Sequence, residues 1–194
     1  MNKFILVIII IIIGVGIWWW QQSANTVITN TGWLTYENRD YNFELQYPND
    51  WTPQESSYDD INTEENKWEP KYWEDWKVVK KISFNTSVEF FYLDVYIMDQ
   101  SIESVLDKVG KNHSNSPFQP SLEEIKINAN QAYVTSVCDL GCCSKDVYIA
   151  KDENTTIQIA RGAVCSVGSE ENIQKAENNT NTFEQILTTF KFAK

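Results

Sequence analysis

An uncharged apolar run near the N-terminus, residues 4–20, constrains this chain more than any other feature. The run contains six consecutive isoleucines, residues 8–13, and ends in three tryptophans, residues 18–20. In a helix these residues span roughly 25 Å, close to the hydrocarbon thickness of a bilayer, and tryptophan favours the headgroup level. Because no polar face interrupts the run, a helix buried in a globular core does not fit. Residues 1–20 are therefore predicted to form one transmembrane helix.

The flanking charges predict the orientation of this helix. Lys3 precedes the run, and the first charged residue after it is Glu37, so the N-terminus is expected in the cytoplasm and the rest outside it. Cleavage of a signal peptide needs small residues before the cut, whereas a cut after Ala24 places Gln22 at the third position. An uncleaved signal anchor is favoured, with a cleaved signal peptide as the alternative. We expect a single-pass protein of the cell membrane, in contact with lipid through residues 4–20, and a flexible polar linker over residues 21–31.

Charge and composition exclude several classes of function. The 194 residues carry 27 acids against 16 bases, a net charge of -11, which argues against binding to nucleic acid. His113 is the one histidine, so histidine-rich metal sites and imidazole-dependent triads are disfavoured. With 7 glycines the chain shows neither phosphate-binding fingerprint. No catalytic residue, cofactor or metal is predicted.

Residues 32–194 show the pattern of one α+β domain. Residues 41–47 alternate apolar and polar side chains up to Pro48, as expected for a strand with one solvated face. Residues 88–98 are apolar on both faces, which indicates a strand in the middle of a covered sheet. Four further strands are predicted near residues 125–127, 132–137, 146–150 and 156–161, and the last two read as a hairpin.

Two helices complete the pattern. The first is expected to begin after the N-cap Ser101 and to stop at Gly110. The second is expected to begin at Thr182, which forms a capping box with Gln185. Its predicted apolar stripe is Phe183, Ile186, Leu187 and Phe190, and Phe192 is expected to dock the tail. The order of strands and helices predicts a mainly antiparallel β-sheet sandwiched by helices.

Two stretches resemble a known family. Residues 41–51 resemble the Y-x-F-x-x-x-Y-P-x-x-W opening of PsbP-like domains, relatives of the extrinsic photosystem II subunit and of the Ran-binding Mog protein. Residues 183–192 resemble the closing helix of small membrane-anchored bacterial proteins that carry this domain. The resemblance implies an α/β/α fold and docking to larger assemblies rather than catalysis, with no active site to transfer. Trp51 matches the family as a fold element and is expected in the core.

The chain contains four cysteines, Cys138, Cys142, Cys143 and Cys165. Outside the cytoplasm thiols tend to oxidise, so two disulfides are predicted. A bond between the adjacent Cys142 and Cys143 is disfavoured by disulfide geometry. Cys138 is therefore expected to pair with Cys142 or Cys143, and the other one with Cys165. A thiolate metal site is the alternative, although the spacing is not that of zinc ribbons.

Residues 51–77 form an acidic, aromatic segment that is too long for an ordinary connection. It holds eight acids against three lysines. Large aromatic side chains in an exposed segment suggest a partner surface. The candidate residues are Trp68, Tyr72, Trp73, Trp76, Asp59, Asp60, Glu64 and Glu65. In the alternative interpretation the rings pack on the sheet and the acids merely solvate the outside.

Three functional hypotheses follow. The first is a non-catalytic, membrane-anchored extracytoplasmic binding or assembly domain, with an envelope protein as its partner. The second is a surface protein that binds or hydrolyses glycans with a carboxylate pair of the acidic segment. The third is a structural surface protein whose acidity provides solubility. Burial of Trp68, Trp73 and Trp76 without two facing carboxylates in a cleft would exclude the second.

Overall fold

The computed structural model describes residues 32–57, 60, 74–85, 92–113, 121–139, 141–165 and 169–193. Those from Trp33 onward belong to one unit of the chain. The predicted transmembrane helix and linker lie outside the described residues and stay predictions. Among the helices that are described, none combines the length and the apolar character needed to cross a bilayer.

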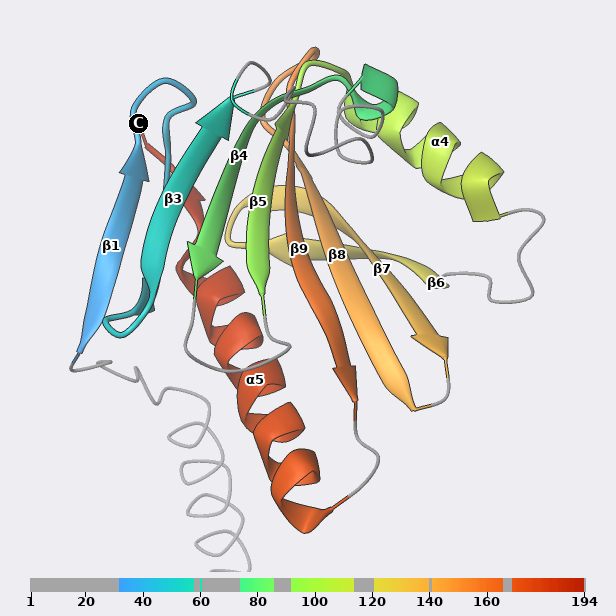
Figure 1. Cartoon of the computed structure of the whole chain (residues 1–194). Coiled ribbons are helices and arrows are strands. Elements are labelled where there is room, and N and C mark those ends of the chain that lie inside the picture. The colour runs from blue at the N-terminus through green and yellow to red at the C-terminus, as the bar shows by residue number, and fades with distance from the viewer. Residues whose placement is uncertain are drawn as a thin grey trace, which may run out of the picture. The chain divides into compact units, whose positions relative to one another are not determined.

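Within the described residues, the larger of two sheets has seven strands, each antiparallel to its neighbours (Figure 1). In spatial order they are β3 (Thr52–Ser57), β4 (Val78–Asn85), β5 (Leu93–Met98), β9 (Thr156–Cys165), β8 (Cys142–Ala150), β7 (Asn130–Asp139) and β6 (Ser121–Ile127). The four strands predicted between residues 125 and 161 are confirmed as β6 to β9, and each is longer than its apolar pattern.

The smaller sheet has the order β1-β2-β10. It contains β1 (Trp33–Asn38), β2 (Phe43–Pro48) and the short C-terminal β10 (Lys191–Phe192). β2 begins later than the alternation predicts, because Tyr41 and Asn42 form the turn from β1 and Asn42 has a φ of 51°. Phe192 pairs with Phe43 and packs on the core, so the predicted docking of the tail is confirmed.

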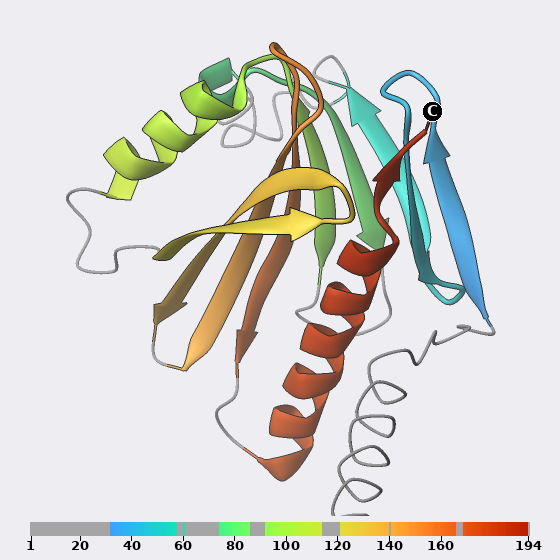
Figure 2. The same ribbon diagram turned by 180° about the vertical axis from the view of Figure 1, so that it is seen from behind.

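One face of the large sheet and the helix α5 (Glu170–Thr189) enclose the main core (Figure 2). Val95, Ile159 and Val147 are register partners across β5, β9 and β8 and are all buried. The helix contributes its predicted apolar stripe to this core: Phe183, Ile186, Leu187 and Phe190. Trp51 is 7% exposed and belongs to the same core, as expected.

The predicted start of the C-terminal helix is wrong. α5 begins at Glu170, and Thr182 lies inside it, where its Oγ1 donates a hydrogen bond to the carbonyl oxygen of Asn178 at 2.9 Å. Threonine can make this bond to the preceding turn as readily as it can cap a helix. The first half of α5 is polar and largely exposed, so it carries no apolar stripe by which the sequence could reveal it.

The helix α4 (Ile102–His113) lies over the opposite face of the sheet, at one end. Its side chains Ile102, Val105 and Val109 pack against Met98 and Tyr148. Gly110 does not stop this helix but lies within it, where a Cβ would meet no atom within 4 Å. The described part is thus a mainly antiparallel sheet with a helix on each face, and the second sheet is a feature that the sequence does not predict.

Two predicted boundaries change at the start of the large sheet. β5 begins at Leu93, and the earlier part of the predicted strand, residues 88–91, lies outside the described residues. The predicted connection over residues 51–77 is wrong in its first part, because Thr52–Ser57 is the edge strand β3. Its sequence, TPQESS, is polar, and proline is tolerated at an edge, so the pattern resembles a loop.

Candidate functional site

Two of the eight residues predicted as a partner surface are described, Trp76 and Asp60. They lie near the two ends of the acidic segment that joins β3 to β4. The other six residues lie outside the described part, and their role stays a prediction: Trp68, Tyr72, Trp73, Asp59, Glu64 and Glu65.

The last turn of the acidic segment, residues 74–76, is fixed onto α4. The Nε2 of Gln100 donates a hydrogen bond to the carbonyl oxygen of Trp76 at 2.7 Å. The Nζ of Lys108 donates to the carbonyl oxygen of Asp75 at 2.6 Å and to the Oε1 of Gln100 at 2.7 Å. We call these residues, 74–76 with Gln100 and Lys108, the α4 corner.

Lys108 also lies over the indole of Trp76, with its Nζ 5.9 Å from the ring centroid. Trp76 is half-buried and packs against the α4 cluster, so it is not a freely exposed stacking platform. The side chains of Glu74 and Asp75 are exposed beside it. The α4 corner therefore presents two acidic side chains. Their backbone is held in place by hydrogen bonds from Gln100 and Lys108, and Lys108 adds a cation–π contact with Trp76.

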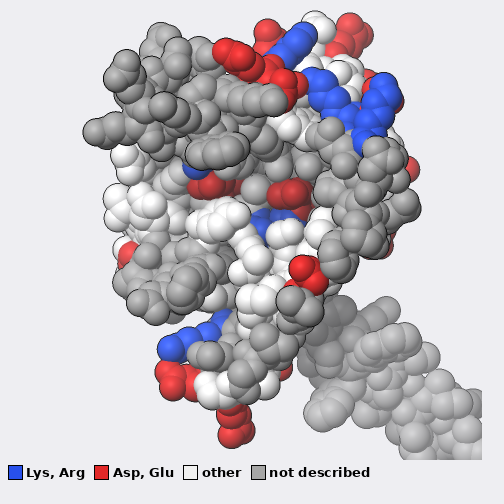
Figure 3. Space-filling view, turned by 45° about the vertical axis from the view of Figure 1, so that its right-hand side comes forward, with Lys and Arg blue, Asp and Glu red and all other residues white. Residues whose placement is uncertain are grey.

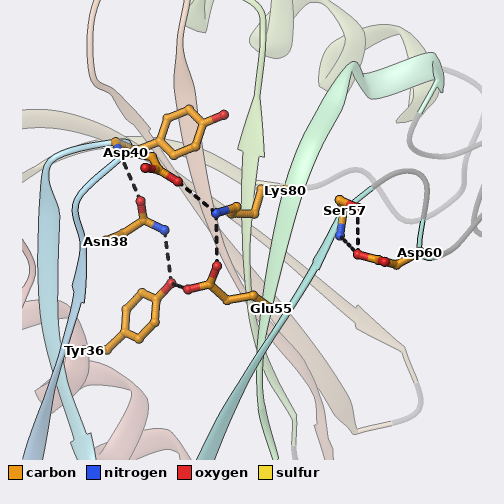
Figure 4. A network of polar contacts seen from close by, with 8 residues as sticks. Tyr36, Asn38, Asp40, Glu55, Ser57, Asp60 and Lys80 are labelled. Atoms are coloured by element: carbon orange, nitrogen blue, oxygen red, sulfur yellow. Dashed lines mark hydrogen bonds and ion pairs between the residues drawn. The ribbon is translucent and has the colours of Figure 1, made fainter.

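Asp60 has a local structural role at the other end of the segment. Its Oδ2 accepts hydrogen bonds from the backbone N–H of Ser57 at 2.8 Å and from the Ser57 hydroxyl at 2.6 Å (Figure 4). These hydrogen bonds lower the pKa of the Asp60 carboxyl. Asp60 is thus bound to Ser57, the last residue of β3, a local contact that aspartate often makes with nearby backbone.

A polar cluster, which we call the clasp, connects the two sheets (Figure 4). The Tyr36 hydroxyl donates to the Oε1 of Glu55 at 2.6 Å and accepts from the Nδ2 of Asn38 at 3.0 Å. Lys80 forms ion pairs with Glu55 at 3.0 Å and with Asp40 at 3.2 Å. Tyr36, Asn38 and Asp40 come from β1 and its turn, whereas Glu55 and Lys80 come from β3 and β4.

The clasp holds Glu55 as an anion. The hydrogen bond from Tyr36 lowers the pKa of the Glu55 carboxyl, and the one from Lys80 adds to this effect. Burial and the contact with Glu55 raise the pKa of Tyr36. A carboxylate held in this way is a poor proton donor at neutral pH, which fits a structural role better than catalysis. The sequence does not predict this cluster, because Glu55 lies within residues 51–77, whose pattern predicts a connection.

A second polar cluster lies on the face of the large sheet opposite to α5. Asp94 is nearly buried, forms an ion pair with the Nζ of Lys81 at 3.3 Å and accepts from the Tyr96 hydroxyl at 3.1 Å. Asp94 and Asp146 are both register partners of Ala160, so the three residues share this face.

Asp146 is the one carboxyl in the described part whose pKa is raised markedly. Although the residue is partly exposed, burial of its carboxyl raises the pKa to about 6, and a hydrogen bond from Gln158 opposes the shift. A carboxyl near this value is partly protonated in mildly acidic solution. Asp94, the other described carboxyl opposite Ala160 on this face, forms an ion pair with Lys81.

Tyr92 packs over Gly162 on the same face. The backbone N–H of Gly162 donates to the carbonyl oxygen of Tyr92 at 3.2 Å, and a Cβ at Gly162 would lie 2.3 Å from the ring. Glycine is thus required for this close approach. Tyr92 remains 52% exposed, and burial, Asp94 and Asp146 together raise the pKa of its hydroxyl.

The four cysteines form two disulfides, Cys138–Cys143 and Cys142–Cys165. Both bonds join direct register partners on neighbouring strands, the first between β7 and β8 and the second between β8 and β9. The structure thus selects one of the two pairings that the sequence leaves open. Because the sulfurs are consumed in disulfides, they do not provide the thiolates that the alternative metal site needs.

Arg161 connects this disulfide-bonded end of the sheet to α5. Its Nη1 donates to the Thr180 hydroxyl at 2.7 Å, and its Nη2 donates to the carbonyl oxygen of Cys143 at 3.0 Å. The guanidinium lies 5.7 Å from the ring centroid of Phe183, and its burial lowers the pKa of Arg161. The sequence does not mark this residue as a candidate, because Arg161 is the last residue of the predicted strand 156–161 and belongs to no motif.

The charge of the chain does not form a single acidic field on the visible surface. Figure 3 shows acidic and basic side chains of the described residues close together, with uncharged surface between them.

Of the comparisons with known proteins, the one with solved structures gives matches. No protein-family model matches the chain, and no curated protein matches it. Among solved structures it is similar to the solution structure of cyanobacterial PsbP (CyanoP) from Synechocystis sp. PCC 6803, at 12% identity and a TM-score of 0.49, over 86% of this chain and 95% of that one. This likeness is one of fold.

A second similar structure is a crystal structure from Bacteroides thetaiotaomicron VPI-5482, at 14% identity and a TM-score of 0.43. The match covers 84% of this chain and 49% of that one, so this chain spans about half of its length. Identities this low describe similarity of fold and say nothing about function.

Proposed function

We propose that this chain is a non-catalytic binding domain that docks an envelope protein at the α4 corner and is tethered to the membrane by residues 4–20. The observation that carries the proposal is the attachment of residues 74–76 by hydrogen bonds from Gln100, which lies just before α4, and from Lys108 on α4. These contacts fix one end of the acidic, aromatic segment to the body of the domain. A fixed backbone lowers the entropic cost of binding a partner.

The chemistry of the corner indicates a basic partner surface. Glu74 and Asp75 are exposed, and the adjoining segment adds more acids and aromatic rings in its sequence. Acidic side chains around aromatic anchors favour a partner that offers lysine or arginine next to an apolar pocket. Such a surface gives specificity and a fast association rate.

The described carboxylates support binding rather than hydrolysis. Glu55 is held by Tyr36 and Lys80, Asp60 by Ser57, and Asp94 by Lys81. Each of these three is engaged by a structural partner, and Asp146, whose burial raises its pKa to about 6, is hydrogen-bonded to Gln158. No described contact favours the alternative of a glycan-binding or glycan-hydrolysing protein, since Trp76 packs against α4.

The tether follows from the sequence. An apolar run of this length with a positive N-terminal flank inserts as a signal anchor and leaves the C-terminal domain outside the cytoplasm. Two disulfides in that domain are consistent with an oxidising compartment. A docking domain held at a membrane surface meets membrane-bound partners at a raised effective concentration.

Co-isolation from solubilised native membranes tests the proposal. The full chain is compared with the double variant Glu74→Lys/Asp75→Lys and with a matched control, Glu170→Lys/Glu177→Lys, which makes the same charge change on exposed positions of α5. We expect the corner variant to lose at least about 90% of the co-isolated partner. The control should retain it. Equal recovery with all three proteins would refute docking at the corner.

A further inference from the structure

The strand β6 forms an exposed edge of the large sheet. Within the described part it pairs with β7 alone, and it is the last strand in the sheet order. Its side chains at Leu122, Glu123, Glu124 and Lys126 are exposed, and Leu122 is 52% exposed. An edge strand presents alternate unpaired N–H and C=O groups and so can pair with another strand.

The charged side chains of β6 favour one register for pairing with β6 of a second copy. Glu124 and Lys126 point to the same face of the strand, on either side of Ile125. If two copies of β6 pair antiparallel about Ile125, Glu124 of each copy lies opposite Lys126 of the other. A two-fold axis then produces this opposite-charge pair twice.

The neighbouring registers are unfavourable. The nearest registers that keep corresponding side chains on the same face of the joined sheet are centred on Glu124 or on Lys126. In the first, Glu124 lies opposite Glu124 of the second copy, and in the other, Lys126 lies opposite Lys126. Like charges directly opposite each other destabilise a strand pair. Centring the pair on Ile125 is thus the register that places opposite charges across two copies of this edge.

Glu124 has a hydrogen-bond partner on the paired side of β6. The Nε2 of Gln131, on β7, donates to the Oε1 of Glu124 at 3.0 Å and to the Tyr133 hydroxyl at 2.8 Å. Because Gln131 lies on β7, this hydrogen bond draws the Glu124 side chain towards β7. Pairing across the open edge therefore requires Glu124 to exchange Gln131 for Lys126 of the second copy, and this exchange weakens the association.

We propose that two copies of this chain associate through β6, antiparallel about Ile125, so that their large sheets join into one. This self-association uses a different surface from the α4 corner and does not depend on the proposed function. The net charge of -11 on each copy opposes association, so the dimer is expected to be weak and reversible.

Sedimentation equilibrium of the full chain in detergent, over a range of concentrations, tests the proposal by charge exchange. Lys126→Glu and Glu124→Lys should each weaken the dimer by about ten-fold, because each turns two opposite-charge pairs into like-charge pairs. The double variant Glu124→Lys/Lys126→Glu restores both pairs with the charges exchanged. It should return the dissociation constant to within about three-fold of the original value.

Lys111→Glu is the matched control, since it makes the same charge change on an exposed position of α4. It should leave the dimer unchanged. The proposal is overturned if the chain stays monomeric throughout, if the single variants dimerise like the original chain, or if the double variant is as weak as the single ones. Unchanged circular dichroism spectra establish that every variant is folded.

Discussion

The Tyr36 hydroxyl and the Glu55 carboxylate belong to different sheets, yet they lie 2.6 Å apart. Neither residue is a candidate in the sequence, because neither belongs to a recognisable motif. Their contact depends on how β1 lies against β3, which is a tertiary property. At the scale of single residues, the structure therefore adds polar contacts that sequence patterns do not encode, and two of them lead to predictions.

Tyr36→Phe removes the hydroxyl that donates to Glu55 and accepts from Asn38. We expect the free energy of unfolding to fall by about 1 kcal/mol, because a partly exposed carboxylate and a buried amide each lose a partner. Urea unfolding at pH 7 measures the change. Tyr41→Phe, which deletes a hydroxyl outside this hydrogen-bond pair, is the control. Equal stability of Tyr36→Phe and the original chain would show that the clasp contributes nothing.

Asp146 predicts a pH dependence. Its folded pKa of about 6 lies above the ordinary aspartate pKa of 3.8, so the folded protein binds this proton more tightly than the unfolded chain does. The charged Asp146 therefore costs stability above pH 6, and this cost disappears as the pH falls towards 3.8. Asp146→Asn should be more stable than the original chain at pH 7.5 by roughly 1–2 kcal/mol. The difference should vanish near pH 4.

Urea unfolding at several pH values measures this difference. Asp152→Asn is a control of opposite sign, because the backbone N–H of Asn154 lowers the pKa of Asp152. An advantage of Asp146→Asn that stays constant from pH 7.5 to pH 4 would contradict titration of Asp146 as its cause.

The strands and helices show where sequence patterns suffice and where they fail. β6 to β9 are predicted because their apolar and polar residues alternate, and the stripe from Phe183 to Phe190 is predicted by its helical spacing. β3 and the first half of α5 are missed because their residues are mostly polar and exposed. Such elements are stabilised by neighbours, and a periodicity argument does not detect them.

The candidate site is predictable to a similar extent. The acids and tryptophans of the acidic segment are visible in the sequence, so the segment is predicted as a partner surface. Its attachment through Gln100 and Lys108 is not visible, because these residues lie well outside it in the chain. The cysteine pairing is predictable in part. The sequence disfavours a Cys142–Cys143 bond because the two residues are adjacent, and the strand register then decides between the two remaining pairings.

The two disulfides are predicted to differ in their contributions to stability. Cys142–Cys165 closes a loop with a sequence separation of 23, whereas that of Cys138–Cys143 is 5. Because a longer loop loses more entropy in the unfolded chain, removal of Cys142–Cys165 should cost about 3 kcal/mol and removal of Cys138–Cys143 about 2 kcal/mol. Urea unfolding of the two double serine variants measures both. The reverse order would contradict the loop-entropy explanation.

At the scale of the whole domain, the two ends of the large sheet differ. The disulfides and Arg161 stabilise one end, and α4 with the fixed residues 74–76 lies at the other (Figure 1). At the disulfide-bonded end, Arg161 joins the large sheet to α5. The α4 end carries exposed acidic side chains on a fixed base. This division fits a domain whose body is rigid and whose docking surface lies at one end.

The membrane tether gives a prediction for the complete chain. If residues 1–20 are an uncleaved signal anchor, the protein from native membranes retains its full mass of 22.5 kDa. Intact-mass spectrometry after detergent extraction measures this. A species that lacks the first ~24 residues would instead identify a cleaved signal peptide.

Docking at the α4 corner is tested most directly by site-specific photo-crosslinking in native membranes. A photoreactive residue replaces Asp75 in the full chain, and in a matched control it replaces Glu37, which is also exposed but lies on β1. Our account predicts one defined crosslinked protein from position 75, absent from position 37 and lost when Trp76→Ala removes the indole under Lys108. The same products from both positions, or none from position 75, would contradict it.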